Sequence, residues 1–199
     1  QADAPNWLIE GGLSTEGTLA HVAVSKYADH LPLYRQCQIY GRGGVDLDRS
    51  TLASWCGVSA YHLGPVVDRM LVHLKRSSRL FMDETRAPVL DPRAGKTKTG
   101  YLWAVTRDDR GWGGGDPPAV VFTYAPGRHG HHAMDILTGF EGILQVDGYT
   151  GYDALAEPKR VGGTPLTLAT NCASSTMLAP AARASASSFV AVSRSASSS

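Results

Sequence analysis

The hydrophobic periodicity of this 199-residue chain changes near residue 79, and this change most restricts the folds that the chain can adopt. Before residue 79, apolar side chains recur at steps of three and four, which is typical of amphipathic helices. After it, the period falls toward two, and aromatic and β-branched residues become frequent, which is typical of strands. The sequence therefore predicts a helical region followed by a mixed α/β region.

The helical region is expected to cover residues 15–78, after an irregular segment at residues 1–14. Pro32 should break the first helix, and Gly57 should separate two later ones, which leaves a weak suggestion of a helix-turn-helix. The expected helices begin near Thr15, near Tyr34, after Asp48 or Ser50, and near Ser59. The last of them carries a continuous apolar stripe made of Leu63, Val66, Val67, Met70, Leu71 and Leu74.

The α/β region is expected to cover residues 79–170. Its strands are expected at residues 80–85, 101–107, 119–124, 143–146 and 166–169, and its helices at residues 132–140 and from residue 152. The strands at 101–107 and 119–124 should pair as a hairpin. The run from Lys96 to Gly100 precedes that hairpin and is interpreted as a loop suited to face phosphate; an ordinary solvated turn is the alternative.

The composition excludes several classes of protein. No run approaches about 18 uninterrupted apolar residues, and no basic segment followed by an apolar one opens the chain, so neither a membrane span nor a secretion signal is expected. The 3 cysteines offer neither an even set nor a C-x-x-C metal motif, which favours a reducing compartment such as the cytoplasm. Because the first residue is Gln1, we expect a piece of a longer protein.

The acidic residues are unevenly distributed. All 18 lie at or before Glu157, although the net charge of the whole chain is only +1. The last 29 residues, 171–199, contain ten Ser and eight Ala with little periodic hydrophobicity. Such a composition cannot bury enough apolar surface to fold, so this tail is expected to be mostly disordered.

Two aspartates follow short apolar strands, Asp83 in the run LFMDET and Asp147 in the run ILQVDGY. If the two strands are neighbours, both carboxylates can bind divalent metal, and hard oxygen ligands favour Mg²⁺ or Mn²⁺. Two such ions about 3.5–4 Å apart can activate a nucleophile and stabilise a leaving oxygen in phosphoryl transfer. Alternatively, each aspartate simply ends its strand or caps the next turn.

Several consecutive blocks of the chain closely resemble bacterial transposases of the insertion sequence sixty-six family. The resemblance spans roughly residues 5–168 and is carried by SKYADHLPLYRQ at 25–36, DRSTLASWCG at 48–57, DET at 83–85, LDP at 90–92, KTKTGYLW at 96–103, RDDR at 107–110 and VDGYTGY at 146–152. Many blocks in the same order are far more specific than a pair of aspartates.

The resemblance implies an RNase H-like catalytic domain that uses an Asp, Asp, Glu triad and Mg²⁺ or Mn²⁺ for DNA strand cleavage and strand transfer. By position, Asp83 and Asp147 match the two catalytic, metal-binding aspartates. Glu84 should point to the opposite side of its strand from Asp83, so it is expected to be a supporting acid rather than a ligand.

The chain departs from the family pattern after Ala169. The family places its catalytic glutamate on a helix downstream of the second aspartate, whereas no carboxylate follows Glu157 here. We therefore expect an incomplete RNase H-like sheet at residues 79–170, and a frameshift or truncation that replaced the rest. Strand transfer by this chain should be inefficient, so whether it is an enzyme stays open.

Five basic residues are candidates for contact with DNA, a role that the resemblance favours: Lys26, Arg35, Arg49, Lys96 and Lys98. Scattered charge on a solvated helix face is the alternative for the first three. The expected partners are transposon-end DNA and a second copy or an intact transposase, and the expected location is the bacterial cytoplasm, at the nucleoid when DNA is bound. Two rival functions are a non-catalytic DNA-binding or transposase-interacting remnant and a metal-dependent hydrolase of a small phosphate ester.

Overall fold

The computed structural model describes residues 7–9, 12, 14–91, 95–156 and 166–170. These residues divide into two compact units, with the division at Pro65. The helical part runs to residue 74 and the first strand begins at residue 79, so the change of secondary structure occurs later than the division between units. The expected tail, residues 171–199, lies outside the described residues.

The first unit is built from helices. Helix α1 (Glu16–Tyr27) begins after Thr15, whose side-chain oxygen accepts a hydrogen bond from the Thr18 N–H at 3.2 Å. Helix α2 (Leu33–Arg42) follows Pro32, and helix α3 (Arg49–Leu74) continues through Pro65. A small core holds the unit together, with Val22, Leu52 and Cys56 buried.

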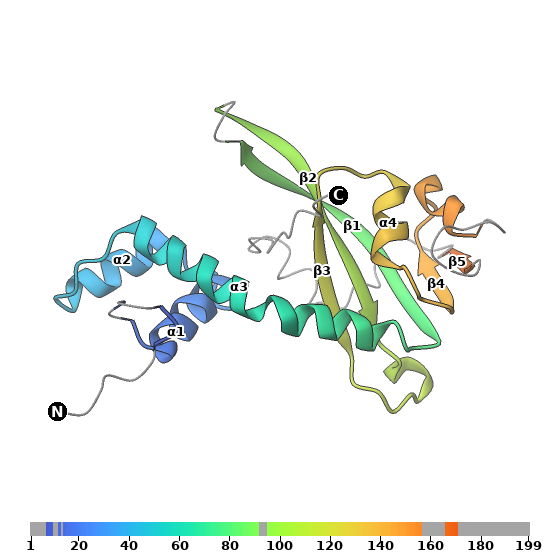
Figure 1. The fold of residues 1–199 in the computed structure, drawn as a ribbon, viewed down its shortest axis with the longest axis horizontal. Helices are drawn as coiled ribbons and strands as arrows, with labels where there is room; N and C mark the ends of the chain where they lie inside the picture. The colour runs from blue at the N-terminus through green and yellow to red at the C-terminus, as the bar shows by residue number, and fades with distance from the viewer. Residues whose placement is uncertain (1–6, 10–11, 13, 92–94, 157–165, 171–199) are drawn as a thin grey trace. The chain divides into compact units, whose positions relative to one another are not determined.

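The second unit contains a five-stranded sheet in the order β3-β2-β1-β4-β5 (Figure 1). Its strands are β1 (Arg79–Asp91), β2 (Lys96–Arg107), β3 (Ala119–Ala125), β4 (Ile143–Val146) and β5 (Thr167–Thr170). The pairs β1–β2 and β2–β3 are antiparallel, whereas β1–β4 and β4–β5 are parallel. The prediction of a mixed α/β fold is confirmed.

The large core of this unit lies against one face of the sheet. Alternate residues of the strands supply it, such as Leu80 and Met82 of β1 and Trp103 and Val105 of β2. Helix α4 (Gly130–Ile136) and the 3-10 helix η2 (Thr150–Leu155) add side chains to it, as does Leu74 at the end of α3. A second 3-10 helix, η1 (Arg110–Trp112), lies between β2 and β3.

β1 and β2 extend past the rest of the sheet as a two-stranded ribbon (Figure 1). β4 pairs with β1 only over Arg79–Phe81, and β3 begins its pairing with β2 at Tyr101, whereas the β1–β2 ladder continues to Asp91 and Lys96. The interpretation of residues 96–100 as a loop is therefore wrong, because they pair with β1 as the start of β2. Strand pairing satisfies their backbone groups, which a surface loop would leave to water.

One expectation for the helices is also wrong. Gly57 does not end a helix: α3 passes through it without interruption, so the suggested helix-turn-helix is absent at this point. The apolar stripe of α3 is only partly used, because Leu71 and Leu74 join the sheet core while Leu63, Val66 and Met70 remain exposed. Among the described residues, no helix has the length and hydrophobicity needed to cross a membrane.

Candidate active site

The parallel pairing of β1 and β4 brings the two predicted aspartates together. The ladder joins Arg79 with Ile143 and Phe81 with Gln145. The same register, continued by two residues, places Asp83 level with Asp147. Asp83 follows the odd-numbered residues of β1 to the face of the sheet opposite the large core, since the core takes the even-numbered residues of β1. Asp147 directly follows β4, and its negative charge acts on Asp83.

The environments of the two carboxylates differ. Asp83 is half-buried and Asp147 is exposed. Burial raises the pKa of Asp83, and the negative charges of Glu84 and Asp147 raise it further, against a lowering by the Glu84 N–H, which donates to Asp83 Oδ1 at 2.9 Å. This region therefore concentrates negative charge that a cation would neutralise.

Glu84 lies on the core side of β1, as the alternation predicts, and its side chain is 0% exposed. Arg128, in the loop before α4, forms an ion pair with Glu84 and donates to Oε1 from its Nε. The Tyr152 hydroxyl donates to Glu84 Oε2 at 2.5 Å. Burial, followed by this bond to a carboxylate, raises the pKa of Tyr152, so its hydroxyl stays protonated and remains a donor.

Arg128 also binds Tyr149, the second residue after Asp147. Its guanidinium carbon lies 3.8 Å from the centroid of the Tyr149 ring, and its carbonyl oxygen accepts a hydrogen bond from the Tyr149 hydroxyl at 3.0 Å. The Tyr149 N–H donates to Asp147 Oδ1 at 3.2 Å. These contacts connect the neighbourhood of Asp83 to that of Asp147.

Sequence reasoning missed Arg128, Tyr149 and Tyr152. The available signal was the spacing of the two tyrosines, three residues apart directly after Asp147, within the block VDGYTGY. Arg128 gave no such signal, because its partner Glu84 is 44 residues away in the sequence.

The donor chemistry of Asp83 and Asp147 fits a hard divalent cation. Mg²⁺ in proteins is commonly bound by one or two carboxylates together with water and substrate phosphate oxygens. Within the part of the chain that the structure describes, no group of three or more His, Cys, Asp or Glu residues is placed to hold a metal ion. The described residues therefore supply two protein ligands and leave the remaining positions to other donors.

The predicted DNA contacts lie on several elements. Lys26 is at the end of α1, half-buried, with its Nζ 5.3 Å from the centroid of the Tyr27 ring. Arg35 in α2 and Arg49 at the start of α3 are exposed. Lys96 and Lys98 are exposed on the ribbon, and Lys98 Nζ lies 3.9 Å from Asp91 Oδ2.

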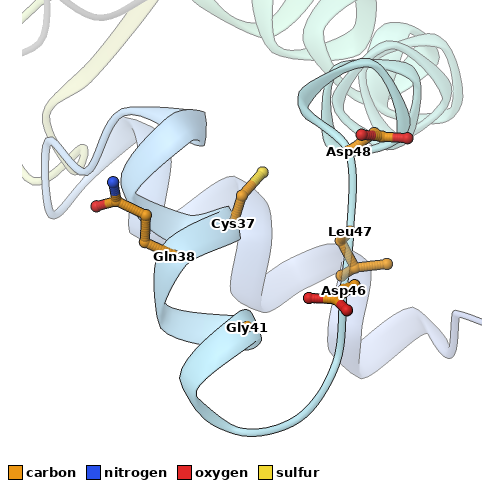
Figure 2. Close-up of a pocket in the computed structure, with 6 residues that line it drawn as sticks. All are labelled: Cys37, Gln38, Gly41, Asp46, Leu47 and Asp48. Atoms are coloured by element: carbon orange, nitrogen blue, oxygen red, sulfur yellow. The ribbon is translucent and has the colours of Figure 1, made fainter.

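A hollow in the first unit contains none of the predicted site residues. It has a volume of about 430 Å³ and lies between α2 and the segment that precedes α3 (Figure 2). Its lining consists of Cys37, Gln38, Gly41, Asp46, Leu47 and Asp48. Two carboxylates make this lining unsuitable for a phosphate.

The fold and the two aspartates define a class of protein. It is a mixed α/β protein in which one carboxylate lies on a strand and a second directly follows the adjacent parallel strand. Comparison with known families is more specific. Residues 11–169 match the family described as Transposase IS66 family. The chain belongs to this family of transposases.

Three similar proteins come from Sinorhizobium fredii (strain NBRC 101917 / NGR234). Uncharacterized protein y4qI is 48% identical over 168 residues, which cover 84% of this chain and 31% of the relative. Uncharacterized protein y4jD is 46% identical over 170 residues, 85% of this chain and 33% of the relative. Uncharacterized protein y4hP is 36% identical over 156 residues, 78% of this chain and 28% of the relative. The chain thus spans about a third of the length of the relatives that it matches.

Proposed function

We propose that this chain carries part of the catalytic domain of a DNA transposase, RNase H-like in fold, with Asp83 and Asp147 as two of its catalytic, metal-binding carboxylates. The observation that carries the proposal is the parallel register of β1 and β4, since its continuation by two residues past Phe81 and Gln145 leads to Asp83 and Asp147. The charge of Asp147 also acts on Asp83, which supports their proximity. Membership of the transposase family supplies the reaction class.

In this proposal, Asp83 and Asp147 would hold Mg²⁺ or Mn²⁺. The bound cation supplies Lewis-acid polarisation of the phosphate and a lower pKa for an attacking water or 3′-hydroxyl. The chain itself contributes position: Asp83 is held by the middle of a long strand, and Asp147 by the turn that follows β4. Rigid placement of this kind lowers the entropic part of the barrier.

The third carboxylate of the family triad has no counterpart after Glu157 in this sequence. We therefore infer that this chain alone has little or no strand-transfer activity. About two thirds of the length of each of these relatives lies outside the matched segment, which leaves room for further ligands in a longer protein.

Metal binding tests the proposal directly. We expect the purified chain to bind Mn²⁺ in calorimetric titration, and Asp83→Asn or Asp147→Asn to weaken binding by more than about tenfold. Asp153→Asn is a matched control, because this exposed aspartate of η2 lies outside the pair. Equal Mn²⁺ affinity in all four proteins would overturn the assignment. Mg²⁺-dependent joining of transposon ends, abolished by Asp147→Asn, would instead overturn the inferred inactivity.

We further propose that Lys26, Arg35, Arg49, Lys96 and Lys98 contact DNA phosphates at transposon ends, which would place the protein at the bacterial nucleoid. The exposure of four of these side chains supports the proposal. Replacing Lys96 and Lys98 with Gln should reduce the slope of log K against log salt concentration by about 2. Arg86→Gln provides a control at the base of the ribbon, since Arg86 is level with Tyr101 and follows the opposite face.

A non-catalytic role is the second candidate, and the absence of any acidic residue after Glu157 favours it. The chain would then occupy transposon ends, as a homo-oligomer or together with an intact transposase. A gel-shift assay distinguishes this role: specific binding of transposon ends, without Mn²⁺ dependence and unaffected by Asp83→Asn, would support it. Binding that requires Mn²⁺ and Asp83 would favour the catalytic domain.

A further inference from the structure

Glu84 is an unusual residue to find beside a candidate metal ligand. Its side chain is 0% exposed, although it carries a charge that is costly to bury without partners. The partners are present: Arg128 forms the ion pair, and the Tyr152 hydroxyl donates to the second oxygen. Glu84 follows the opposite face of β1 from Asp83, so the hydrogen bonds that it accepts are separate from the one that the Asp83 carboxylate accepts.

Asp147 needs support from beyond its own strand. β4 ends at Val146, its ladder with β1 ends at Gln145, and its ladder with β5 ends at Val146. Gly148, which follows Asp147, carries no side chain that could anchor the turn. The position of the Asp147 carboxylate therefore depends on how the next few residues are held.

Those residues are held by Glu84 and by its ion-pair partner Arg128. Tyr152 binds Glu84 through its hydroxyl, and Tyr149 binds Arg128 through both its ring and its hydroxyl. The Tyr149 N–H then donates to Asp147 Oδ1. Two routes thus run from the residue next to Asp83 to the turn that carries Asp147.

We propose that Glu84, Arg128, Tyr149 and Tyr152 are a positioning cluster that holds the Asp147 carboxylate level with Asp83. The proposal rests on the proposed function, because it assigns these residues to the same metal site. One strand serves both purposes: the odd-numbered face of β1 presents a ligand, and the even-numbered face anchors the segment that carries the other ligand. None of the four residues needs to touch the metal.

Tyr152→Phe tests the cluster with the loss of a single oxygen atom. We expect Tyr152→Phe to weaken Mn²⁺ binding by about tenfold or more, as changes to groups that orient metal ligands do. Tyr101→Phe is the matched control, because Tyr101 also packs against the sheet core but lies outside the cluster. Each titration is made well below the unfolding temperature of the variant, so that loss of folded protein does not contribute.

A second variant separates orientation from general stability. Arg128→Lys keeps the positive charge but loses the paired donors of the guanidinium, so Mn²⁺ affinity should fall here too. Hydrogen exchange of the Tyr149 N–H gives a metal-free measurement: exchange should accelerate in Tyr152→Phe and Arg128→Lys and stay unchanged in Tyr101→Phe. If Tyr152→Phe or Arg128→Lys fails to fold, Tyr149→Phe is measured in its place, because it removes the hydroxyl that donates to the Arg128 carbonyl oxygen.

The outcomes are distinguishable. Wild-type Mn²⁺ affinity and wild-type Tyr149 exchange in both cluster variants, with weak binding only in Asp83→Asn and Asp147→Asn, would overturn the positioning cluster and leave the proposed function intact. Wild-type affinity in Asp83→Asn and Asp147→Asn would overturn both. Reduced affinity in the cluster variants and in the two aspartate variants, but not in Tyr101→Phe, is the expected result.

Discussion

The two compact units of this protein differ in how far along the sequence their contacts reach. In the helical unit, consecutive helices bury a small core around Leu52, and Tyr61 and Leu63 of α3 stay exposed. In the sheet unit, β1 pairs with β4 across more than 60 intervening residues and closes a large core. Local periodicity therefore accounts for most of the first unit, whereas the sheet of the second depends on long-range strand register.

The largest expected effect is on the sheet core. Trp103 is 0% exposed, and its ring centroid lies 6.0 Å from that of Tyr152. Trp103→Ala should lower the free energy of unfolding by about 3–5 kcal/mol, because it leaves a large cavity. Urea denaturation measures the change. Trp112→Ala, at a side chain that is 52% exposed, is the control and should cost less than about 1 kcal/mol.

The core of the helical unit should lose less stability than the sheet core when a buried side chain is truncated to alanine. Leu52 is 0% exposed, but few buried residues surround it, so Leu52→Ala should cost about 2–3 kcal/mol, near the lower limit for such a change. Hydrogen exchange followed by mass spectrometry measures each unit separately, and protection should fall in α1 and α2. An equal loss of protection in β1 and β2 would show that the two units do not unfold separately.

Replacing glycine with alanine should lower the stability of the sheet unit and raise that of the helical unit. A Cβ on Gly130 would lie 2.1 Å from the carbonyl oxygen of Gly151, so Gly130→Ala should destabilise the sheet unit by about 1–3 kcal/mol. A Cβ on Gly57 meets nothing within 4 Å, so Gly57→Ala should stabilise α3 by about 0.5–1 kcal/mol. Thermal unfolding measures both, and equal signs would contradict the contrast in packing.

The smallest expected effect is the acid dependence of an exposed ion pair. Hydrogen bonds from the Arg110 side chain lower the pKa of Asp108 to about 2. A depressed folded pKa stabilises the protein above the unfolded value of about 3.9, and this stabilisation is lost as the pH falls toward 2. The urea midpoint of Asp108→Asn should therefore approach that of the wild type between pH 5 and pH 2.5. A constant difference would show that the pair contributes nothing.

Local patterns predicted several elements well. The strand at residues 143–146 has the predicted bounds, and the helix expected to begin near Thr15 begins at Glu16. Gly57 wrongly indicated the end of a helix. A glycine inside a helix costs only about 1 kcal/mol, which is less than the ends of two separate helices would cost. The ribbon was missed because neither of its strands alternates between polar and apolar residues: residues 96–99 are all polar, whereas residues 87–90 are apolar on both faces and include Pro88.

The candidate site was predictable only in part. The two aspartates stand out in the sequence because each follows an apolar run, but nothing local indicates that their strands are neighbours. Arg128 could not be found at all, since its role arises from an ion pair between distant segments. Residues that act through tertiary contacts become visible only once strand register is known.

The length of β1 sets the distance between the carboxylate of Asp83 and the basic side chain of Lys98. Lys98 is level with Val89, six residues beyond Asp83 on the same face of the ladder. At about 3.4 Å per residue, that separation is roughly 20 Å. B-form DNA rises about 3.4 Å per nucleotide along each strand, so the same distance spans about six base pairs. In the proposed function, Lys98 would therefore contact a duplex about half a helical turn from the metal site at Asp83.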